Sequence, residues 1–170
     1  MTLLVAKRSS FGNYVFNDTF GLELSSEGIR RTLLKKLEVD SNKSASFSGF
    51  KPRDFKLLDL SPDDFEAEVL DWWGFYYRKF GRLDIFSSTI VLVSHGDIHS
   101  LEIDFHGVRH YEIFDRLISG SFNPSSEFLI TEDFSEERAL AFLNQNKANG
   151  LNNSLLEYAV SKDNSFVSNL

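Results

Sequence analysis

The stretch Ser88-Thr-Ile-Val-Leu-Val-Ser-His-Gly-Asp-Ile-His-Ser-Leu-Glu-Ile-Asp-Phe105 contains two runs that are typical of β-strands, joined by a short turn. Both Ser88–Ser94 and Ile98–Phe105 are rich in β-branched and other apolar residues. The connection His95-Gly-Asp97 is short and contains the glycine that tight hairpin loops favour. This stretch therefore predicts an antiparallel hairpin, and with it a fold built on a sheet.

Further strands are predicted on the N-terminal side of this hairpin. The segments 3–7 and 13–24 are separated by a polar connection, and Tyr14, Phe16 and Phe20 recur at even spacing in the second. Such a period of two is typical of a strand with one buried face. Shorter strands are predicted at 56–60 and 128–131.

Five segments have the apolar spacing or the terminal residues of helices. The clearest begins at Ser61-Pro62, where a capping serine precedes a proline at the first helical position, and ends at Gly81. Its large apolar residues are spaced to share one face, which we expect to anchor the core: Phe65, Val69, Trp72, Trp73, Tyr76 and Phe80. The other helices are predicted at 29–37, 108–119, 135–149 and 151–160.

Hairpins with helices between them indicate an α+β fold, in which a mainly antiparallel sheet is covered on one face by three to five helices. A chain of 170 residues predicts a single domain spanning 1–170. The polar run 39–46 is predicted to be a flexible loop, and 161–170 a frayed tail.

Composition restricts the chemistry that this chain can perform. It contains no cysteine, which excludes disulfides, thiolate metal sites and a cysteine nucleophile. The longest aliphatic runs are Leu3–Ala6 and Ile90–Val93, far shorter than a membrane span requires. No nucleotide-binding or metalloprotease motif occurs, so we expect no cofactor. These features together favour a cytoplasmic protein without membrane contact.

Charge is distributed unevenly along the chain. Residues 1–60 carry 10 Lys and Arg against 7 Asp and Glu, a net charge of +3, whereas residues 61–170 carry 8 against 18, a net charge of −10. An acidic surface attracts basic partners and repels nucleic acid. In size and charge the chain resembles bacterial immunity proteins, which inhibit nuclease toxins. We therefore expect an acidic cytoplasmic protein that blocks a basic partner protein.

The carboxylates nearest to the hairpin are the predicted binding residues for such a partner, with aromatic anchors supplied by Phe75 and Tyr77. The predicted carboxylates are Asp97, Glu102, Asp104, Glu112 and Asp115. Nucleic acid is an unfavoured partner, because only the basic segment Arg30–Lys36 supports it. A homo-oligomer is an open alternative.

A metal- or histidine-dependent hydrolase is the alternative function. All four histidines fall between His95 and His110, and the imidazole group titrates near neutral pH. This alternative assigns catalytic roles to His95, His99 and His106. A metal ion would be held by His95, Asp97 and His99, provided that the turn folds these three side chains together.

Overall fold

The computed structural model describes residues 2–25, 28–52, 55–61, 63–80, 87–104, 106–120, 133–146 and 154–170. The described strands are β1 Leu3–Lys7, β2 Tyr14–Asp18, β3 Phe20–Ser25, β4 Gly28–Leu33, β5 Glu38–Val39, β6 Lys43–Pro52, β7 Ser88–Ser94, β8 Ile98–Asp104, β9 Gly107–Glu112, β10 Arg116–Gly120, β11 Leu156–Lys162 and β12 Ser165–Ser168. The helices are α1 Phe65–Phe80, α2 Glu136–Asn146 and the 3₁₀ helix Leu57–Asp59.

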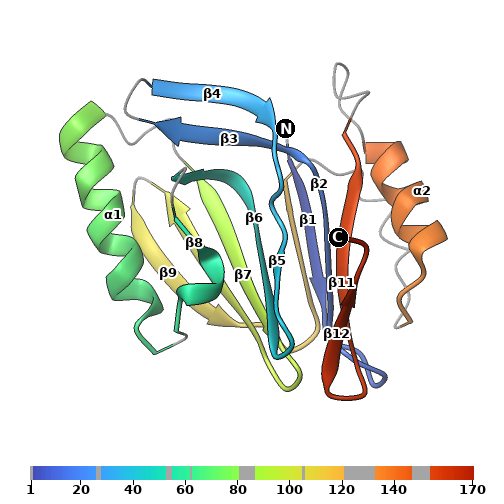
Figure 1. Ribbon diagram of the computed structural model, residues 1–170. Coiled ribbons are helices and arrows are strands. Elements are labelled where there is room, and N and C mark those ends of the chain that lie inside the picture. The colour runs from blue at the N-terminus through green and yellow to red at the C-terminus, as the bar shows by residue number, and fades with distance from the viewer. Residues whose placement is uncertain are drawn as a thin grey trace.

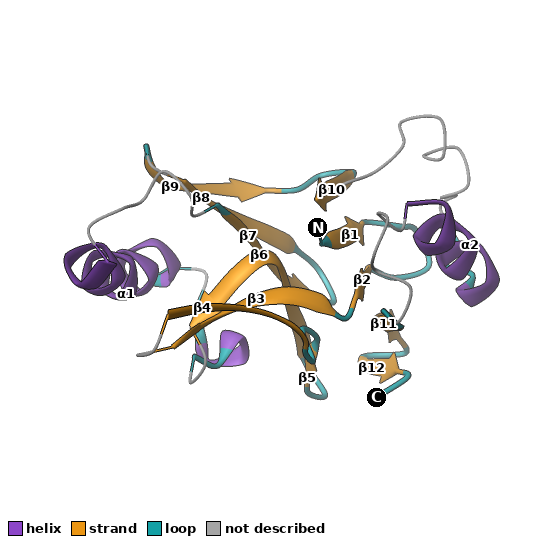
Figure 2. Ribbon diagram, turned by 90° about the horizontal axis from the view of Figure 1, so that it is seen from above, coloured by secondary structure: helices purple, strands orange, loops and turns teal. Residues whose placement is uncertain are grey.

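The strands form two sheets that pack face to face (Figure 1). The β1 sheet has the strand order β10-β1-β2-β11-β12, and every neighbouring pair in it is antiparallel. The β7 sheet has the order β4-β3-β6-β7-β8-β9, with β5 paired to β6, and its β3–β6 pair is parallel. Figure 2 shows α1 and α2 on the two outer sides of this sandwich.

The chain passes from one sheet to the other at Thr19. Strand β2 ends at Asp18 in the β1 sheet, and β3 begins at Phe20 in the β7 sheet. The Thr19 backbone is held on both sides, because its N–H donates to the Leu155 carbonyl and its carbonyl accepts the Leu34 N–H. This crossing brings Asp18 and the segment after β4 together.

Three apolar layers account for the core. Leu4, Ala6 and Val15 pack between the sheets against Val91 and Val93. The outer face of the β1 sheet packs on α2, with Phe142 at 0% exposure. The outer face of the β7 sheet carries the third layer: Ala45, Phe47, Phe50, Leu57, Leu58, Leu60, Ile90, Leu92, Leu101 and Ile103. Central strands are therefore covered on both faces, which explains the uninterrupted apolar run of β1.

The predicted α+β fold, with one face of a sheet covered by three to five helices, is wrong. The described residues contain two α-helices and one 3₁₀ helix, placed on opposite sides of two packed sheets. Segment 29–37 contains most of β4, 108–119 contains most of β9 and β10, and 151–160 contains the start of β11. Each was predicted as a helix from apolar spacing, but pairing with a neighbouring strand decided the conformation.

Other segments also differ from the sequence interpretation or fall outside what the structure describes. Residues 56–60 contain the 3₁₀ helix, 39–46 belong largely to β5 and β6, and 161–170 include β12. Segment 128–131 lies outside the described residues. So do the side chains of the predicted core face of α1: Phe65, Val69, Trp72, Trp73, Tyr76 and Phe80.

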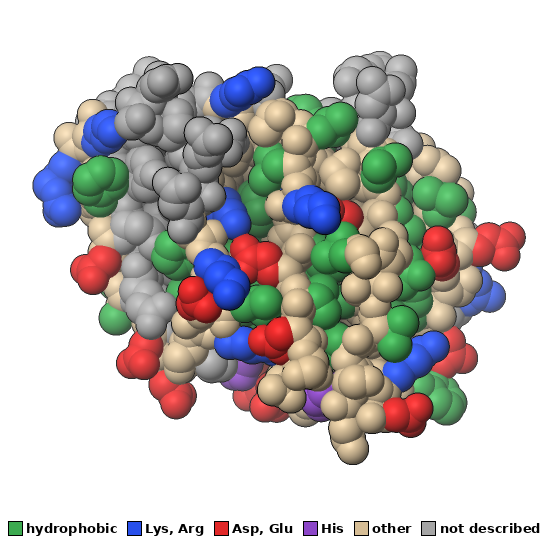
Figure 3. Space-filling model, in the orientation of Figure 1, with side chains coloured by type: hydrophobic (Ala, Val, Ile, Leu, Met, Phe, Trp, Pro, Cys, Tyr) green, Lys and Arg blue, Asp and Glu red, His purple; other side chains and the backbone are tan. Residues whose placement is uncertain are grey.

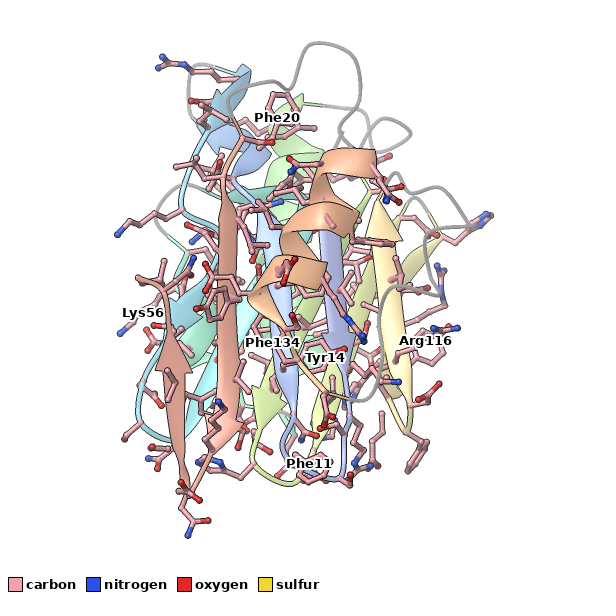
Figure 4. All side chains as sticks on the ribbon, turned by 90° about the vertical axis from the view of Figure 1, so that its right-hand side faces the viewer. Phe11, Tyr14, Phe20, Lys56, Arg116 and Phe134 are labelled. Carbon is pink, nitrogen blue, oxygen red and sulfur yellow. The ribbon has the colours of Figure 1, made fainter. Side chains whose placement is uncertain are left out.

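Tyr14 lies in the apolar layer under α2, and its ring centroid is 5.2 Å from that of Phe134 (Figure 4). Burial raises the pKa of the Tyr14 phenol above its ordinary value of 10, although the nearby charge of Arg116 partly opposes this. The unfolded chain releases the Tyr14 proton near pH 10, whereas the folded chain releases it only at higher pH. The contribution of this group to the free energy of unfolding is therefore fully present below pH 10 and decreases as the pH rises above 10.

The free energy of unfolding should therefore fall by about 1 kcal/mol more between pH 10 and pH 11 in the natural protein than in Tyr14→Phe. Urea unfolding at both pH values measures this difference. Tyr77→Phe, which removes the hydroxyl group of a side chain that is 50% exposed on α1, is the control for loss of a phenol away from the core. An identical pH dependence in Tyr14→Phe and the natural protein would contradict the prediction.

Candidate active site

Thr2 immediately precedes β1, and it is 8% exposed although it carries a hydroxyl group. Its Oγ1 accepts a hydrogen bond of 2.9 Å from the backbone N–H of Gly49 on β6. Because this bond uses the oxygen as acceptor, the hydroxyl proton remains able to be donated to a base. The side chain is thus fixed in place while its proton stays transferable.

Two glycines with positive φ, Gly49 and Gly120, line the Thr2 pocket and allow neighbouring backbone segments to approach closely. Gly49 has φ +94°, and a Cβ there would lie 2.2 Å from the Ser87 carbonyl oxygen. Gly120 on β10 has φ +101°, and a Cβ there would lie 1.6 Å from the Thr2 carbonyl oxygen. Real side chains would be excluded at both positions, so glycine is required for the approach of β6 to Ser87 and of β10 to Thr2.

Thr2 and Gly49 line a pocket of about 240 Å³. Hydroxyl groups from three strands meet in it: Ser48 and Ser119 are 2.6 Å apart, and Ser119 donates to Thr89 over 2.9 Å. The complete lining is Thr2, Ser48, Gly49, Ser87, Ser88, Thr89, Glu102, Ile103, Asp104, Arg109, Ser119 and Gly120. The pocket is therefore mainly polar, although the sheets around it pack through apolar layers.

A buried ion pair lies next to the start of β1. The Lys36 Nζ is 2.5 Å from the Asp18 Oδ1, and the two side chains are 0% and 3% exposed. The same Oδ1 accepts the backbone N–H of Leu3 at 3.0 Å. Asp18 therefore ties the charge of Lys36 to the residue that follows Thr2.

Glu157 extends this polar network on β11. Its Oε2 accepts three hydrogen bonds of 3.0 Å, from the backbone N–H groups of Lys36 and Leu37 and from the Asn17 side chain. Asn17 in turn accepts the Ser46 hydroxyl at 2.6 Å. Several donors satisfy the buried carboxylate, as the burial of a charge requires.

Burial lowers the pKa of the Lys36 ammonium, and the attraction of Asp18 and then of Glu157 partly opposes this effect. Desolvation penalises the charged form of lysine, so a lowered pKa eases proton release. Perturbed pKa values of this kind are common at catalytic sites, and the partner of this lysine, Asp18, binds the backbone of the residue that follows Thr2.

The structure pairs each of the five predicted binding carboxylates with a basic side chain of the same chain. Arg8 is 3.5 Å from Asp97 and 3.9 Å from Glu112, and Lys7 is 3.3 Å from Asp115. Arg109 is 3.6 Å from Glu102 and 2.6 Å from Asp104. On the face drawn in Figure 3, acidic and basic side chains are likewise interspersed.

The histidines of the predicted hydrolase are distributed over separate contacts. The His95 Nδ1 is hydrogen-bonded to the Ser161 hydroxyl, and its ring lies 5.0 Å from that of Phe166. The His99 and His110 side chains meet at 3.0 Å, whereas His106 lies in the turn after β8. Within the described ranges, no group of three or more His, Cys, Asp or Glu side chains could hold a metal ion.

The predicted aromatic anchors Phe75 and Tyr77 lie on α1, at 51% and 50% exposure. The Lys79 Nζ is 5.8 Å from the centroid of the Phe75 ring. Their role as a contact surface stays a prediction.

Sequence reasoning missed Thr2, Asp18 and Lys36. Asp18 stands in phase with Tyr14, Phe16 and Phe20, and a charge at such a position is the signal that could have revealed it. Lys36 was missed because it lies in the basic segment 30–36, which was predicted to be part of a helix. Thr2 offered no local signal, since its partners lie 47 residues away.

No protein-family model and no curated protein sequence matches the chain. Among solved structures, it is similar to Anbu (ancestral beta-subunit) from Yersinia bercovieri, with a TM-score of 0.63 and 13% identity over 94% of this chain and 82% of that one. The helical assembly of the Anbu complex from Pseudomonas aeruginosa gives 0.61 and 15%, over 98% and 84%. An Anbu (Gly-1) mutant from Hyphomicrobium sp. strain MC1 gives 0.52 and 12%, over 100% and 85%.

The chain has an Anbu-like fold. This likeness overturns the predicted immunity-protein function, because the structural neighbours are Anbu proteins and not toxin inhibitors. The five carboxylates share three basic side chains of the same chain, Lys7, Arg8 and Arg109, so part of their charge is compensated internally.

The Pseudomonas aeruginosa neighbour is a helical assembly, whereas for this chain a homo-oligomer stays a prediction. No helix in the described part of the chain is both long and apolar enough to cross a membrane.

Proposed function

We propose that this protein is a hydrolase that uses Thr2 as its nucleophile and cleaves an amide or ester bond. The observation that carries this proposal is the Thr2 hydroxyl, which lies in a polar pocket and accepts the Gly49 N–H at 2.9 Å. Threonine acts as a nucleophile when an adjacent amine removes its proton, and the N-terminal amine of the same residue can do this.

The reaction requires Thr2 to carry a free α-amine, so whatever precedes it must first be removed. An α-amine has an ordinary pKa near 7.7–8.0 and accepts protons at neutral pH. The Thr2 Oγ1 then attacks the substrate carbonyl carbon and passes its proton to this amine. The bond to the leaving group breaks as the amine returns the proton, and water hydrolyses the resulting threonine ester.

Gly49 supports the developing negative charge in this scheme. Its N–H already points at the nucleophilic oxygen, and the oxyanion formed on attack is separated from that oxygen only by the carbonyl carbon. An amide placed here before the reaction stabilises the transition state without reorganisation. The positive φ of Gly49 and its contact with Ser87 hold the amide in this orientation.

Asp18 and Lys36 are positioning residues in the proposed site. Asp18 fixes the backbone of Leu3, and the cation of Lys36 holds Asp18 in turn. A positive charge close to the start of β1 also favours loss of a proton from neighbouring groups. The pair thereby keeps the nucleophile in register with the Gly49 amide.

A β-lactone carrying a neutral pentyl arm tests this function, because attack by a hydroxyl opens the ring and adds the whole lactone mass. The full chain is produced with a cleavable leader directly before Thr2, so that cleavage leaves Thr2 as the first residue. We expect one adduct, mapped to Thr2 by peptide mass spectrometry. Protein that retains the leader lacks the free α-amine and should stay unlabelled at Thr2. An adduct confined to other residues, or no adduct on the cleaved protein, would overturn the proposal.

A further inference from the structure

The wall of the Thr2 pocket is a row of side chains that crosses four strands of the β7 sheet. Ser48 on β6 is directly opposite Thr89 on β7, Thr89 is opposite Glu102 on β8, and Glu102 is opposite Arg109 on β9. Side chains directly opposite each other in antiparallel strands lie on the same face, about 5 Å apart. All four line the pocket, so this row leads away from Thr2 towards Arg109.

Arg109 interacts more strongly with Asp104 than with Glu102. Arg109 binds Asp104 through two hydrogen bonds of 2.6 and 3.2 Å, a strong bidentate arrangement. Asp104 also accepts the backbone N–H of His106, and the hydrogen bonds from Arg109 lower the pKa of the Asp104 carboxyl. Arg109 is therefore committed mainly to Asp104.

The negative charge of Glu102, which lines the pocket, is only weakly compensated by Arg109. Its ion pair with Arg109 spans 3.6 Å, and its side chain is 41% exposed. The charged lining residues are Glu102, Asp104 and Arg109, which together carry a net charge of −1. Because Asp104 is neutralised by Arg109, this surplus lies on Glu102, the charged residue of the row that is nearer to Ser48 and Thr89.

We infer that the pocket selects substrates with a positively charged side chain close to the scissile bond, and that Glu102 is the specificity-determining residue. This inference rests on the proposed role of Thr2. A lysine-like ammonium in the pocket replaces part of its lost hydration with the Glu102 carboxylate, whereas an apolar arm leaves that carboxylate with only its 3.6 Å ion pair to Arg109. An acidic side chain meets the same charge and is repelled.

Two β-lactones test the inference, one with an aminobutyl arm and one with the pentyl arm, which has nearly the same shape without the charge. In the natural protein with a free Thr2, we expect the aminobutyl probe to label Thr2 about tenfold faster at low salt. In Glu102→Gln, which keeps the size of the side chain, the two rates should become equal. Asp115→Asn removes one negative charge outside the pocket lining and should keep the tenfold preference.

The outcomes separate this inference from the proposed function. Labelling of Thr2 by both probes without preference, or a preference that survives in Glu102→Gln, would overturn the specificity while leaving the Thr2 nucleophile in place. Absence of Thr2 labelling with either probe would overturn both. Circular dichroism of Glu102→Gln confirms that the variant is folded before the rates are compared.

Discussion

Thr2→Ala is expected to lose β-lactone labelling by at least about 10⁴-fold, because removing the nucleophile leaves the pocket without an attacking atom. The substitution also removes one hydrogen bond acceptor for Gly49, which costs about 1 kcal/mol of stability, so the variant should remain folded. Labelling rates are measured by intact mass on protein in which position 2 is the first residue.

Two companion variants make this result specific. Thr2→Ser keeps a hydroxyl at the same position and should label within about tenfold of the natural rate. Ser48→Ala removes another hydroxyl of the same pocket, one bonded to Ser119, and should change the rate only a few-fold. Equal labelling of Thr2→Ala and the natural protein would show that the reactive group lies elsewhere.

Asp18→Ala is expected to lower the free energy of unfolding by about 3–5 kcal/mol, because it leaves Lys36 buried without its counter-ion. The variant also removes the acceptor of the Leu3 N–H, next to the nucleophile. Urea denaturation at pH 7 measures the loss. A change below 1 kcal/mol would contradict the description of this pair as buried and mutually dependent.

A matched control separates burial from the loss of an ion pair as such. Asp59→Ala also breaks a lysine–carboxylate pair, with Lys56, but both side chains are exposed, at 73% for Asp59 and 64% for Lys56. Exposed pairs contribute at most about 1 kcal/mol, so this variant should be nearly as stable as the natural protein. The double variant Asp18→Leu with Lys36→Met removes both charges together and should cost less than Asp18→Ala alone.

Local signals in the sequence were sufficient to predict the elements that are bounded by helix-capping residues or tight turns. The hairpin of β7 and β8 was predicted from its apolar runs and the glycine between them, and Ser135 marked the start of α2. The helix after Ser61-Pro62 was found in the same way. In these segments, local preference and tertiary environment favour the same structure.

The sheet edges were mispredicted because their conformation depends on distant partners. Residues 28–33 have apolar spacing compatible with a helix, yet they pair with β3 along six positions. Likewise, 116–120 are held in a strand by β1, more than a hundred residues earlier in the chain. Spacing within a segment cannot report such pairing, and so the second sheet was missed.

The candidate site was missed for a related reason. Its members come from the start of β1, the end of β2, the segment after β4 and the middle of β6, and no two of them are close in sequence. The four histidines are clustered along the chain and so indicated a site, whereas the structure distributes them over separate contacts.

The pairing of β1 with β10, and of β2 with β11, means that the first twenty residues reach their final surroundings late. Contacts between such distant parts of a chain slow folding, because a long loop must close before they form. During synthesis, Thr2 lacks Gly120 beside it until residue 120 has left the ribosome, and β2 lacks β11 for still longer. The proposed nucleophile would therefore reach its complete surroundings only after most of the chain has been made.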